Sequence, residues 1–235
     1  MKKIIEKILY SDRLSDDQIF RQKGRIHTFL NPCSYLIARN NQDVYLKYDR
    51  VYADGMLLTR IVNILFFKNI HRRSMDMTSL ADPLFTFCES NNKTIYFLGS
   101  TEEEIKKFVS TLKQKYNLKV IGYRNGYIKS EKEKNEIISN IIRLNPDILL
   151  VGMGSPLQEI ILNDISSGGW SGIGFTCGGF FHQSIYKTKY YPQWIDILNL
   201  RFAYRIYKEK HTRSRYAEAF IKFPFYILND MINHK

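Results

Sequence analysis

Short apolar runs alternate with amphipathic segments through the second half of the chain. Runs typical of strands end in glycine-rich or polar turns, and they cover 93–100, 118–127, 147–155 and 171–179. Segments with helical spacing of apolar residues lie between them, at 101–116, at 130–145 and after 155. This alternation predicts a parallel sheet with right-handed crossovers. Ligands bind such sheets at the carboxyl ends of the strands, where the turns after 98, 121, 151 and 176 fall.

The first sixty residues predict two more strands, at 25–32 and 50–55, with a helical segment at 34–48 between them. Both strands carry polar residues toward their ends. Thr28 and Asn31 lie in the first strand, and Asp54 closes the second. We therefore expect these side chains near the ligand-binding edge of the sheet.

Strand alternation stops at about residue 190. The segment 190–235 is predicted to be helical and is rich in Tyr, Phe, Arg and Lys. We expect an α/β domain over 1–189, a Rossmann-like parallel sheet flanked by helices, followed by a basic and aromatic helical appendage over 190–235. Within the appendage, 220–228 fits an anchor at a membrane surface and fits equally a terminal helix packed on the core.

The charge balance narrows the choice of partner. Lys plus Arg (35) exceed Asp plus Glu (23), which gives a net charge of +12. This favours an anionic partner, such as nucleic acid, a phosphorylated metabolite or an acidic membrane surface. The cysteines, Cys33, Cys88 and Cys177, form no Cys-x-x-Cys pair, so neither a zinc site nor a disulfide framework is predicted. No signal peptide and no apolar run long enough to span a bilayer is recognised.

The turn in 147–159, DILLVGMGSPLQE, has two interpretations. Gly152 and Gly154 permit a tight turn, and Ser155 with Gln158 fits a capping box for a helix that begins at Pro156. Alternatively, small glycines and free helix N–H groups at the end of a strand form a place for an anion or for sugar hydroxyls. The spacing does not choose between them.

Five motifs in a fixed order carry a resemblance. They are HTFLNP, YADGM, DILLVGMGSPLQE, GFTCGGFF and PQWIDILNLRFAYRIYKE, and they extend over about 25–228. Together they resemble the WecG/TagA/CpsF family of bacterial glycosyltransferases. The resemblance implies inverting transfer of N-acetylmannosamine or a related sugar from a UDP-sugar to a polyprenyl-diphosphate-linked sugar, with no metal or other cofactor. Such reactions serve teichoic acid, common antigen, capsule or exopolysaccharide synthesis at the inner face of the cell membrane.

The resemblance also assigns roles to residues. Inverting transfer needs a base for the acceptor hydroxyl, and Asp54 matches the family's Asp-Gly position. The residues that we expect to bind substrate are Thr28, Asn31, Arg73, Gly152, Gly154, Gln158, Glu159, Gly178 and Gly179. Those that we expect to hold the diphosphate are Arg205, Arg213 and Arg215. Without the resemblance, a turn-stabilising Asp, a strand stop, a helix cap and a solvated basic face would explain the same residues.

Three departures from the family pattern bear on the donor sugar. The segment 72–80, RRSMDMTSL, replaces a Thr-Gly-x-Asp-Leu segment, so that only Arg73 matches comfortably. His182 stands where an Asp usually follows Gly-Gly-x-Phe, and Leu57 stands where a small residue or Pro is common. These changes leave the reaction class unaltered but make the identity of the donor open.

Two other classes of protein compete with this interpretation. A nucleic-acid-binding protein of α/β fold would account for the charge, but no RNA- or DNA-binding module is recognised. A dinucleotide-dependent oxidoreductase would need Gly-x-Gly-x-x-Gly after a strand, and GMGSPLQ lacks the third glycine. We therefore expect a UDP-sugar, a lipid-linked acceptor and the membrane surface as partners, and no nucleic acid. Whether the chain forms homo-oligomers is left open.

Overall fold

A parallel sheet forms the centre of the computed structural model, which describes residues 1–185, 195, 204 and 213–232. Six strands, all parallel, follow the order β2-β1-β6-β5-β3-β4. The strands are β1 (Ile26–Leu30), β2 (Arg50–Ala53), β3 (Thr94–Gly99), β4 (Lys119–Arg124), β5 (Ile148–Gly152) and β6 (Ile173–Thr176). The predicted α/β fold with a parallel sheet is confirmed.

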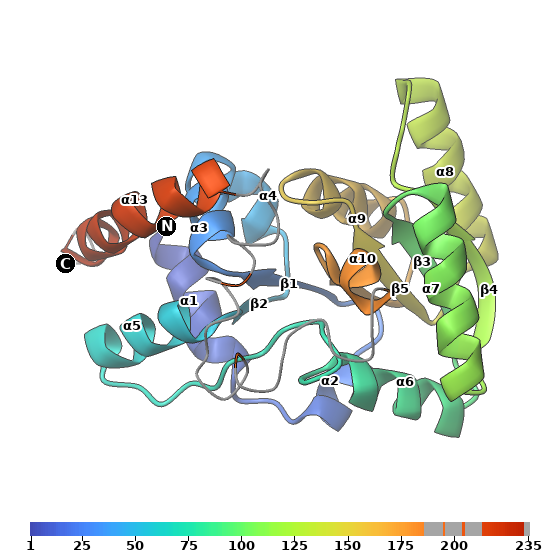
Figure 1. Cartoon of the computed structure of the whole chain (residues 1–235), viewed down its shortest axis with the longest axis horizontal. Helices are drawn as coiled ribbons and strands as arrows, with labels where there is room; N and C mark the ends of the chain where they lie inside the picture. Colours follow the sequence, from blue (N-terminus) through green and yellow to red (C-terminus); the bar gives the residue numbers. More distant parts are fainter. Residues whose placement is uncertain (186–194, 196–203, 205–212, 233–235) are drawn as a thin grey trace.

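Helices cover both faces of this sheet (Figure 1). One face packs against α1 (Lys2–Ser11), α3 (Pro32–Asn40), α4 (Gln42–Leu46), α5 (Met56–Phe66), α8 (Glu131–Leu144), α9 (Leu157–Ser167) and α13 (Arg213–Ile232). The other face packs against α2 (Asp16–Arg21), α6 (Ala81–Ser90), α7 (Glu102–Lys115) and α10 (Phe180–Ile185). Alternate residues of β5 enter the two cores, Leu149 and Val151 on the first face and Ile148 and Leu150 on the second. The strand is therefore apolar throughout, because both of its faces are buried.

The chain leaves the neighbouring strands β1 and β6 in opposite directions. β1 continues into α3 on one face of the sheet, and β6 continues into α10 on the other. Two neighbouring strands whose connections diverge in this way leave a crevice at their carboxyl ends, which is where α/β sheets bind ligands. The strand order thus locates the candidate site between β1 and β6.

Two expectations for local structure are wrong in detail. β4 runs to Arg124 and does not end at 121, so Gly122 lies inside the strand. This glycine leaves room for the Tyr96 ring, since a Cβ there would come within 2.5 Å of it. The helical segment at 34–48 is divided into α3 and α4, which meet at Asn41. The Asn41 backbone has φ −134° and ψ 41°, outside the helical region, so the helix cannot continue through it.

Helix α13 packs on α3 through one face. Phe223 and Ile227 are fully buried, and the Phe223 ring meets the Tyr35 ring edge to face with 5.2 Å between centroids. Asp230 accepts hydrogen bonds from Arg39, at 2.8 Å from both Nε and Nη2, and from the Tyr35 hydroxyl at 2.9 Å. Burial and the nearby Asp230 carboxylate raise the pKa of Tyr35, so its hydroxyl stays a donor. The packed terminal helix is therefore confirmed for this part of the chain.

The outer face of α13 exposes large apolar side chains beside the Glu218–Lys222 ion pair. Ile221 is 66% exposed and Phe225 is 72% exposed. No helix within the described ranges is long and apolar enough to cross a membrane. The predicted boundary between 1–189 and 190–235 lies outside the described residues and stays a prediction.

Candidate active site

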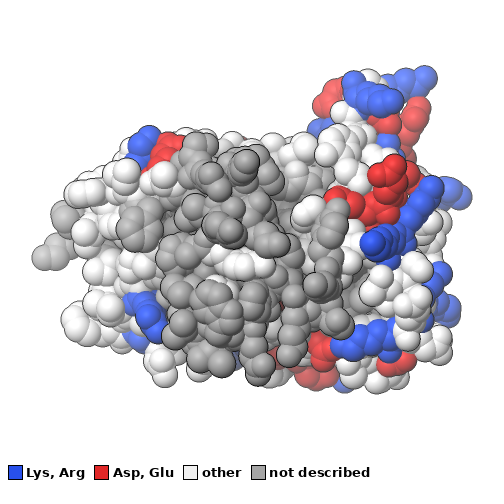
Figure 2. Space-filling view, in the orientation of Figure 1, with Lys and Arg blue, Asp and Glu red and all other residues white. Residues whose placement is uncertain are grey.

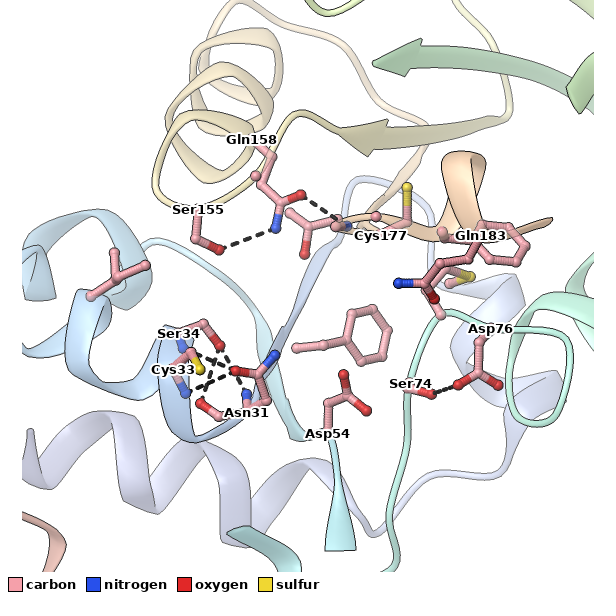
Figure 3. A pocket seen from close by; sticks show the side chains of 18 residues that line it. Asn31, Cys33, Ser34, Asp54, Ser74, Asp76, Ser155, Gln158, Cys177 and Gln183 are labelled. Carbon is pink, nitrogen blue, oxygen red and sulfur yellow. Dashed lines mark hydrogen bonds between the residues drawn. The ribbon is translucent and has the colours of Figure 1, made fainter. Parts of the chain in front are cut away.

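A pocket opens at the carboxyl edge of the sheet, where β1, β2, β5 and β6 end (Figure 3). Strand register makes these ends level: Leu30 pairs with Ala53, and Val151 pairs with Thr176. The next residues along β1 and β2 are Asn31 and Asp54, and both line the pocket. The sequence thus brings together polar residues that are 23 positions apart.

Asp54 directs its carboxylate into this pocket from the end of β2 (Figure 3). Its backbone N–H donates to Leu30 O at 2.7 Å, which ties it to the end of β1. Gly55 follows with φ +87°, a conformation that favours glycine, and it starts α5. The Asp54 side chain is 30% exposed, so it is held by the fold and still open to a ligand.

An arginine and a second carboxylate stand beside Asp54. Arg72 Nη2 lies 3.4 Å from Asp54 Oδ1, 2.5 Å from Asp76 Oδ2 and 2.5 Å from Ser74 Oγ. Burial alone would lower the pKa of Arg72, but the two carboxylates outweigh it and raise that pKa. Burial alone would raise the pKa of Asp76, but Arg72 and hydrogen bonds from Ser74 and Thr78 outweigh it and lower that pKa. The cluster therefore places one shared guanidinium between the carboxylates of Asp54 and Asp76.

Arg72, and not the predicted Arg73, lies beside Asp54. Arg73 Nη2 donates to Leu14 O at 2.5 Å and lies 3.6 Å from Asp16, and its guanidinium stands over the Tyr52 ring. Neither arginine lines the pocket itself, and Arg72 differs from Arg73 in its contact with Asp54, which does line it. Adjacent arginines in a segment that departs from the family pattern give no signal of which one faces the site.

Asn31 presents an N–H donor to the pocket. Its Oδ1 accepts from the backbone N–H groups of Cys33 at 2.9 Å and Ser34 at 3.0 Å and so caps α3, in a capping box completed by Ser34. Since only the amide oxygen can accept these bonds, Nδ2 must lie on the opposite side, toward the pocket (Figure 3). Capping and ligand binding are compatible here, because they use different atoms.

Gln158 braces two turns of the pocket wall. Its Oε1 accepts from the Gly178 N–H at 3.0 Å, and its Nε2 donates to Glu159 Oε1 at 2.8 Å and to Ser155 Oγ at 3.3 Å. The capping-box interpretation is therefore wrong: α9 begins at Leu157, and no side chain caps its N-terminus. The Ser155 hydroxyl is instead directed at Glu159 Oε1, at 3.0 Å.

Thr28 and Glu159 lie behind the pocket wall, and both are fully buried. Thr28 Oγ1 donates to Glu159 Oε1 at 3.1 Å and accepts from Thr176 Oγ1 at 2.9 Å. Burial raises the pKa of Glu159, while hydrogen bonds from Gln158, Ser155 and Thr28 partly offset that rise. Neither residue lines the pocket, so the structure gives them internal partners where the sequence suggested substrate contacts.

The four predicted glycines divide into two kinds. Gly154, Gly178 and Gly179 line the pocket, and the first two have φ of +78° and +54°. Gly152 does not line it. A Cβ on Gly152 would come within 2.8 Å of Cys177 Sγ and 2.9 Å of Gly178 O, so this glycine lets the β5 and β6 turns pack together.

The predicted diphosphate-binding arginines cannot be placed at the pocket. Arg205 lies outside the described residues, and Arg213 and Arg215 are described only as part of the backbone of α13. Their role stays a prediction.

His182, one of the departures from the family pattern, joins α10 to α7. Its Nδ1 lies 2.6 Å from Glu104 Oε1, and Glu104 also accepts from the Ser100 hydroxyl at the end of β3. The next residue, Gln183, lines the pocket. Leu57, the other single-residue departure, is in the first turn of α5 and is 39% exposed.

Metal-binding groups and surface charge were both considered over the described residues. In that part of the chain, no group of three or more His, Cys, Asp or Glu side chains is arranged to hold a metal ion. On the face in Figure 2, Lys and Arg side chains lie intermixed with Asp and Glu over α7 and α8. The excess of positive charge therefore forms no single-sign surface over these two helices.

Comparisons with known proteins agree on one family. The model of the glycosyl transferase WecG/TagA/CpsF family matches residues 11–235. The chain is 33% identical over 202 residues to a UDP-Gal:alpha-D-GlcNAc-diphosphoundecaprenol beta-1,4-galactosyltransferase of Shigella boydii, over 86% of this chain and 83% of that protein. It is 23% identical to an N-acetylglucosaminyldiphosphoundecaprenol N-acetyl-beta-D-mannosaminyltransferase of Bacillus subtilis (strain 168), over 84% and 77% of the two chains. Because the family match extends over nearly the whole sequence, this chain belongs to the WecG/TagA/CpsF family and is a glycosyltransferase.

Proposed function

We propose that this glycosyltransferase moves a hexose or N-acetylhexosamine from a UDP-sugar onto a polyprenyl-diphosphate-linked N-acetylglucosamine, with inversion at the anomeric carbon. Both relatives carry names that describe sugar transfer to GlcNAc linked to diphosphoundecaprenol, which supports the acceptor. One name includes UDP-Gal, which supports a UDP-sugar donor. The reaction would serve the synthesis of a cell-surface polysaccharide, at the membrane face where the lipid-linked acceptor lies.

The position of Asp54 is the observation that carries the mechanism. Inversion requires one displacement step, in which the acceptor hydroxyl attacks the anomeric carbon as a base removes its proton. Asp54 is a carboxylate at a strand end, open to the pocket and held there by the Leu30 carbonyl and by the Gly55 turn. In this proposal Asp54 takes the proton of the acceptor hydroxyl.

Arg72 and Asn31 would assist Asp54 from either side. Arg72 would fix one oxygen of Asp54, because its Nη2 lies 3.4 Å from Asp54 Oδ1. Asn31 Nδ2 offers a hydrogen bond to a sugar oxygen in the same pocket. The developing charge on the leaving UDP needs further donors and cations, and we assign that task to the arginines of the C-terminal segment.

Release of UDP tests this proposal. We expect wild-type protein to release UDP from one member of a panel (UDP-Gal, UDP-Glc, UDP-GlcNAc and UDP-ManNAc) only when a short polyprenyl-diphosphate-GlcNAc is present. Addition of EDTA is expected to leave the rate unchanged. Asp54→Asn should abolish the release, whereas Asp43→Asn, an exposed carboxylate on α4, should not alter it.

Two results would contradict the proposal. UDP release that does not depend on the acceptor would show hydrolysis in place of transfer. Full activity of Asp54→Asn would remove Asp54 as the base.

A further inference from the structure

Glu159 lies at the centre of a buried set of hydrogen bonds behind the pocket wall. Three side chains, those of Gln158, Ser155 and Thr28, all direct donors at its Oε1, at 2.8, 3.0 and 3.1 Å. Glu159 itself is 0% exposed and Gln158 is 4% exposed. Among the described residues, no partner reaches the other oxygen, Oε2. The carboxylate therefore serves protein groups and offers no surface to a substrate.

These hydrogen bonds connect three separate strand ends. Thr28, on β1, donates to Glu159, as do Ser155 in the β5–α9 turn and Gln158 in the first turn of α9. Thr176, on β6, is joined to this set by its bond to Thr28. Gln158 then extends the connection to the β6–α10 turn, because its Oε1 accepts from Gly178 N–H (Figure 3). The part of the wall that these bonds reach includes Gly178 and Gly179, which line the pocket.

A carboxylate at this position fixes which way the Gln158 amide faces. An amide group has one acceptor end and one donor end, and either end could face a neighbour. Glu159 Oε1 is an acceptor here, since the Ser155 and Thr28 hydroxyls also donate to it, so Nε2 faces Glu159 and Oε1 faces Gly178. The bond that holds the Gly178 turn is therefore selected by Glu159, although Glu159 does not touch that turn.

We propose that Glu159 is a positioning residue of this glycosyltransferase: acting through Gln158, it holds the Gly178–Gly179 turn in the place where that turn forms the wall of the pocket. The structural part of this inference stands on the hydrogen bonds alone. Its effect on turnover rests on the proposed function.

The sequence offers a direct way to observe the Gly178 hydrogen bond. Cys177–Gly178 is the only Cys–Gly pair in the chain. Protein labelled with carbonyl-13C cysteine and 15N glycine therefore gives one correlated amide signal, that of Gly178. A hydrogen-bonded amide proton resonates downfield of a free one, so loss of the bond moves this signal upfield.

We expect Glu159→Leu to move the Gly178 signal upfield and Glu159→Gln to leave it close to the wild-type position, because glutamine can still accept from Gln158. Gln158→Met removes the acceptor directly and should also move the signal upfield. If Glu159→Leu does not fold, this variant still tests whether Gln158 holds the Gly178 N–H. Glu136→Leu, an exposed position on α8, serves as the matched control. An unmoved Gly178 signal in folded Glu159→Leu, or in Gln158→Met, would overturn the inference.

Kinetics of the same variants test the effect on turnover. We expect Glu159→Leu to lower kcat/KM about 10- to 100-fold, the size typical of a misplaced site, and Glu159→Gln to restore most of it. The double variant with Gln158→Met should lose no more than the worse single variant, because both act on one turn. Additive losses, or equal losses in Glu159→Gln and Glu159→Leu, would overturn the role through Gln158. If wild-type protein transfers no sugar, the proposed function fails, and the Gly178 signal still decides the inference.

Discussion

On the β1 and β2 side of the pocket, Asn31 and Asp54 direct polar atoms into the open space, whereas on the β5 and β6 side Gln158 and Glu159 direct theirs at each other and at Gly178. Asp54 is 30% exposed, and Glu159 is fully buried. Asp54 directly follows β2, whereas Glu159 lies in the first turn of α9. We therefore propose that the β1 and β2 side supplies the catalytic groups and that the β5 and β6 side supplies the shape of the pocket.

The pocket side of β1 and β2 should be the more sensitive to loss of a single charge. We expect Asp54→Asn to lower kcat by ~10²- to 10⁴-fold, the range for removal of a general base. Asp76→Asn should cost less, because Asp76 is linked to Asp54 through Arg72 and is not the proposed base. Steady-state rates of UDP release for the two variants measure the contrast. A larger loss for Asp76→Asn would make Asp76 the better candidate for the base.

The neighbouring arginines provide a matched pair. Arg72→Met should lower kcat/KM by about 10- to 100-fold, because the Asp54 carboxylate loses the cation that orients it. Arg73→Met should leave kcat/KM near the wild-type value and instead lower the free energy of unfolding, since Arg73 contacts Leu14 and the Tyr52 ring. Kinetics and urea denaturation of both variants separate the two effects. The reverse pattern would restore Arg73 as the site residue.

Thr28→Val tests the buried hydrogen bonds that join β1 to Glu159 and to β6, with almost no change of side-chain shape. The variant leaves Thr176 without its hydroxyl acceptor and Glu159 with one donor fewer. We expect a loss of about 1–3 kcal/mol in the free energy of unfolding, the cost of leaving a buried polar group unpaired. Thr86→Val, at an exposed position on α6, is the control. Equal urea midpoints for the two variants would show that the buried hydrogen bonds contribute little to stability.

The smallest expected effect is a pH dependence that belongs to Glu159. Burial raises the pKa of Glu159 in the folded chain above its ordinary value of 4.5. The folded state then binds more protons than the unfolded state above about pH 4.5, so this group's contribution to stability falls as pH rises through the folded pKa. Glu159→Gln removes that contribution. We expect its free energy of unfolding, relative to wild type, to be higher at pH 7 than at pH 4.5, and a pH-independent difference would contradict the raised pKa.

Much of the fold could be predicted from the order of residues. Alternating apolar runs gave the parallel sheet, since strands buried on both faces carry little but apolar residues. The positions of Asn31 and Asp54 directly after two strands brought both to the pocket, because parallel strands end at a common edge. These features follow from the local pattern of apolar residues and from the rule that parallel strands of one sheet end at the same edge.

The partners of the polar side chains could not be predicted in the same way. Thr28 meets Glu159 across 131 positions of sequence, and no local pattern encodes that contact. The Ser155–Gln158 spacing fits a capping box, yet Glu159 and Gly178 take the same polar groups in the folded chain. Arg72 and Arg73 are neighbours of the same residue type, yet Arg72 contacts Asp54 and Arg73 contacts Leu14. In each example, the partner of the polar side chain is set by a tertiary contact that the local sequence does not show.

The most direct test of the central claim separates binding from turnover at Asp54. Calorimetry would give the Kd of UDP for wild type and for Asp54→Asn, and a single-turnover assay with the lipid-linked acceptor would give the rate of transfer. The account predicts a Kd within about threefold of wild type and a rate at least ~100-fold lower, because the base acts on the acceptor during transfer. A variant that loses UDP binding but transfers sugar at the wild-type rate when saturated would contradict it.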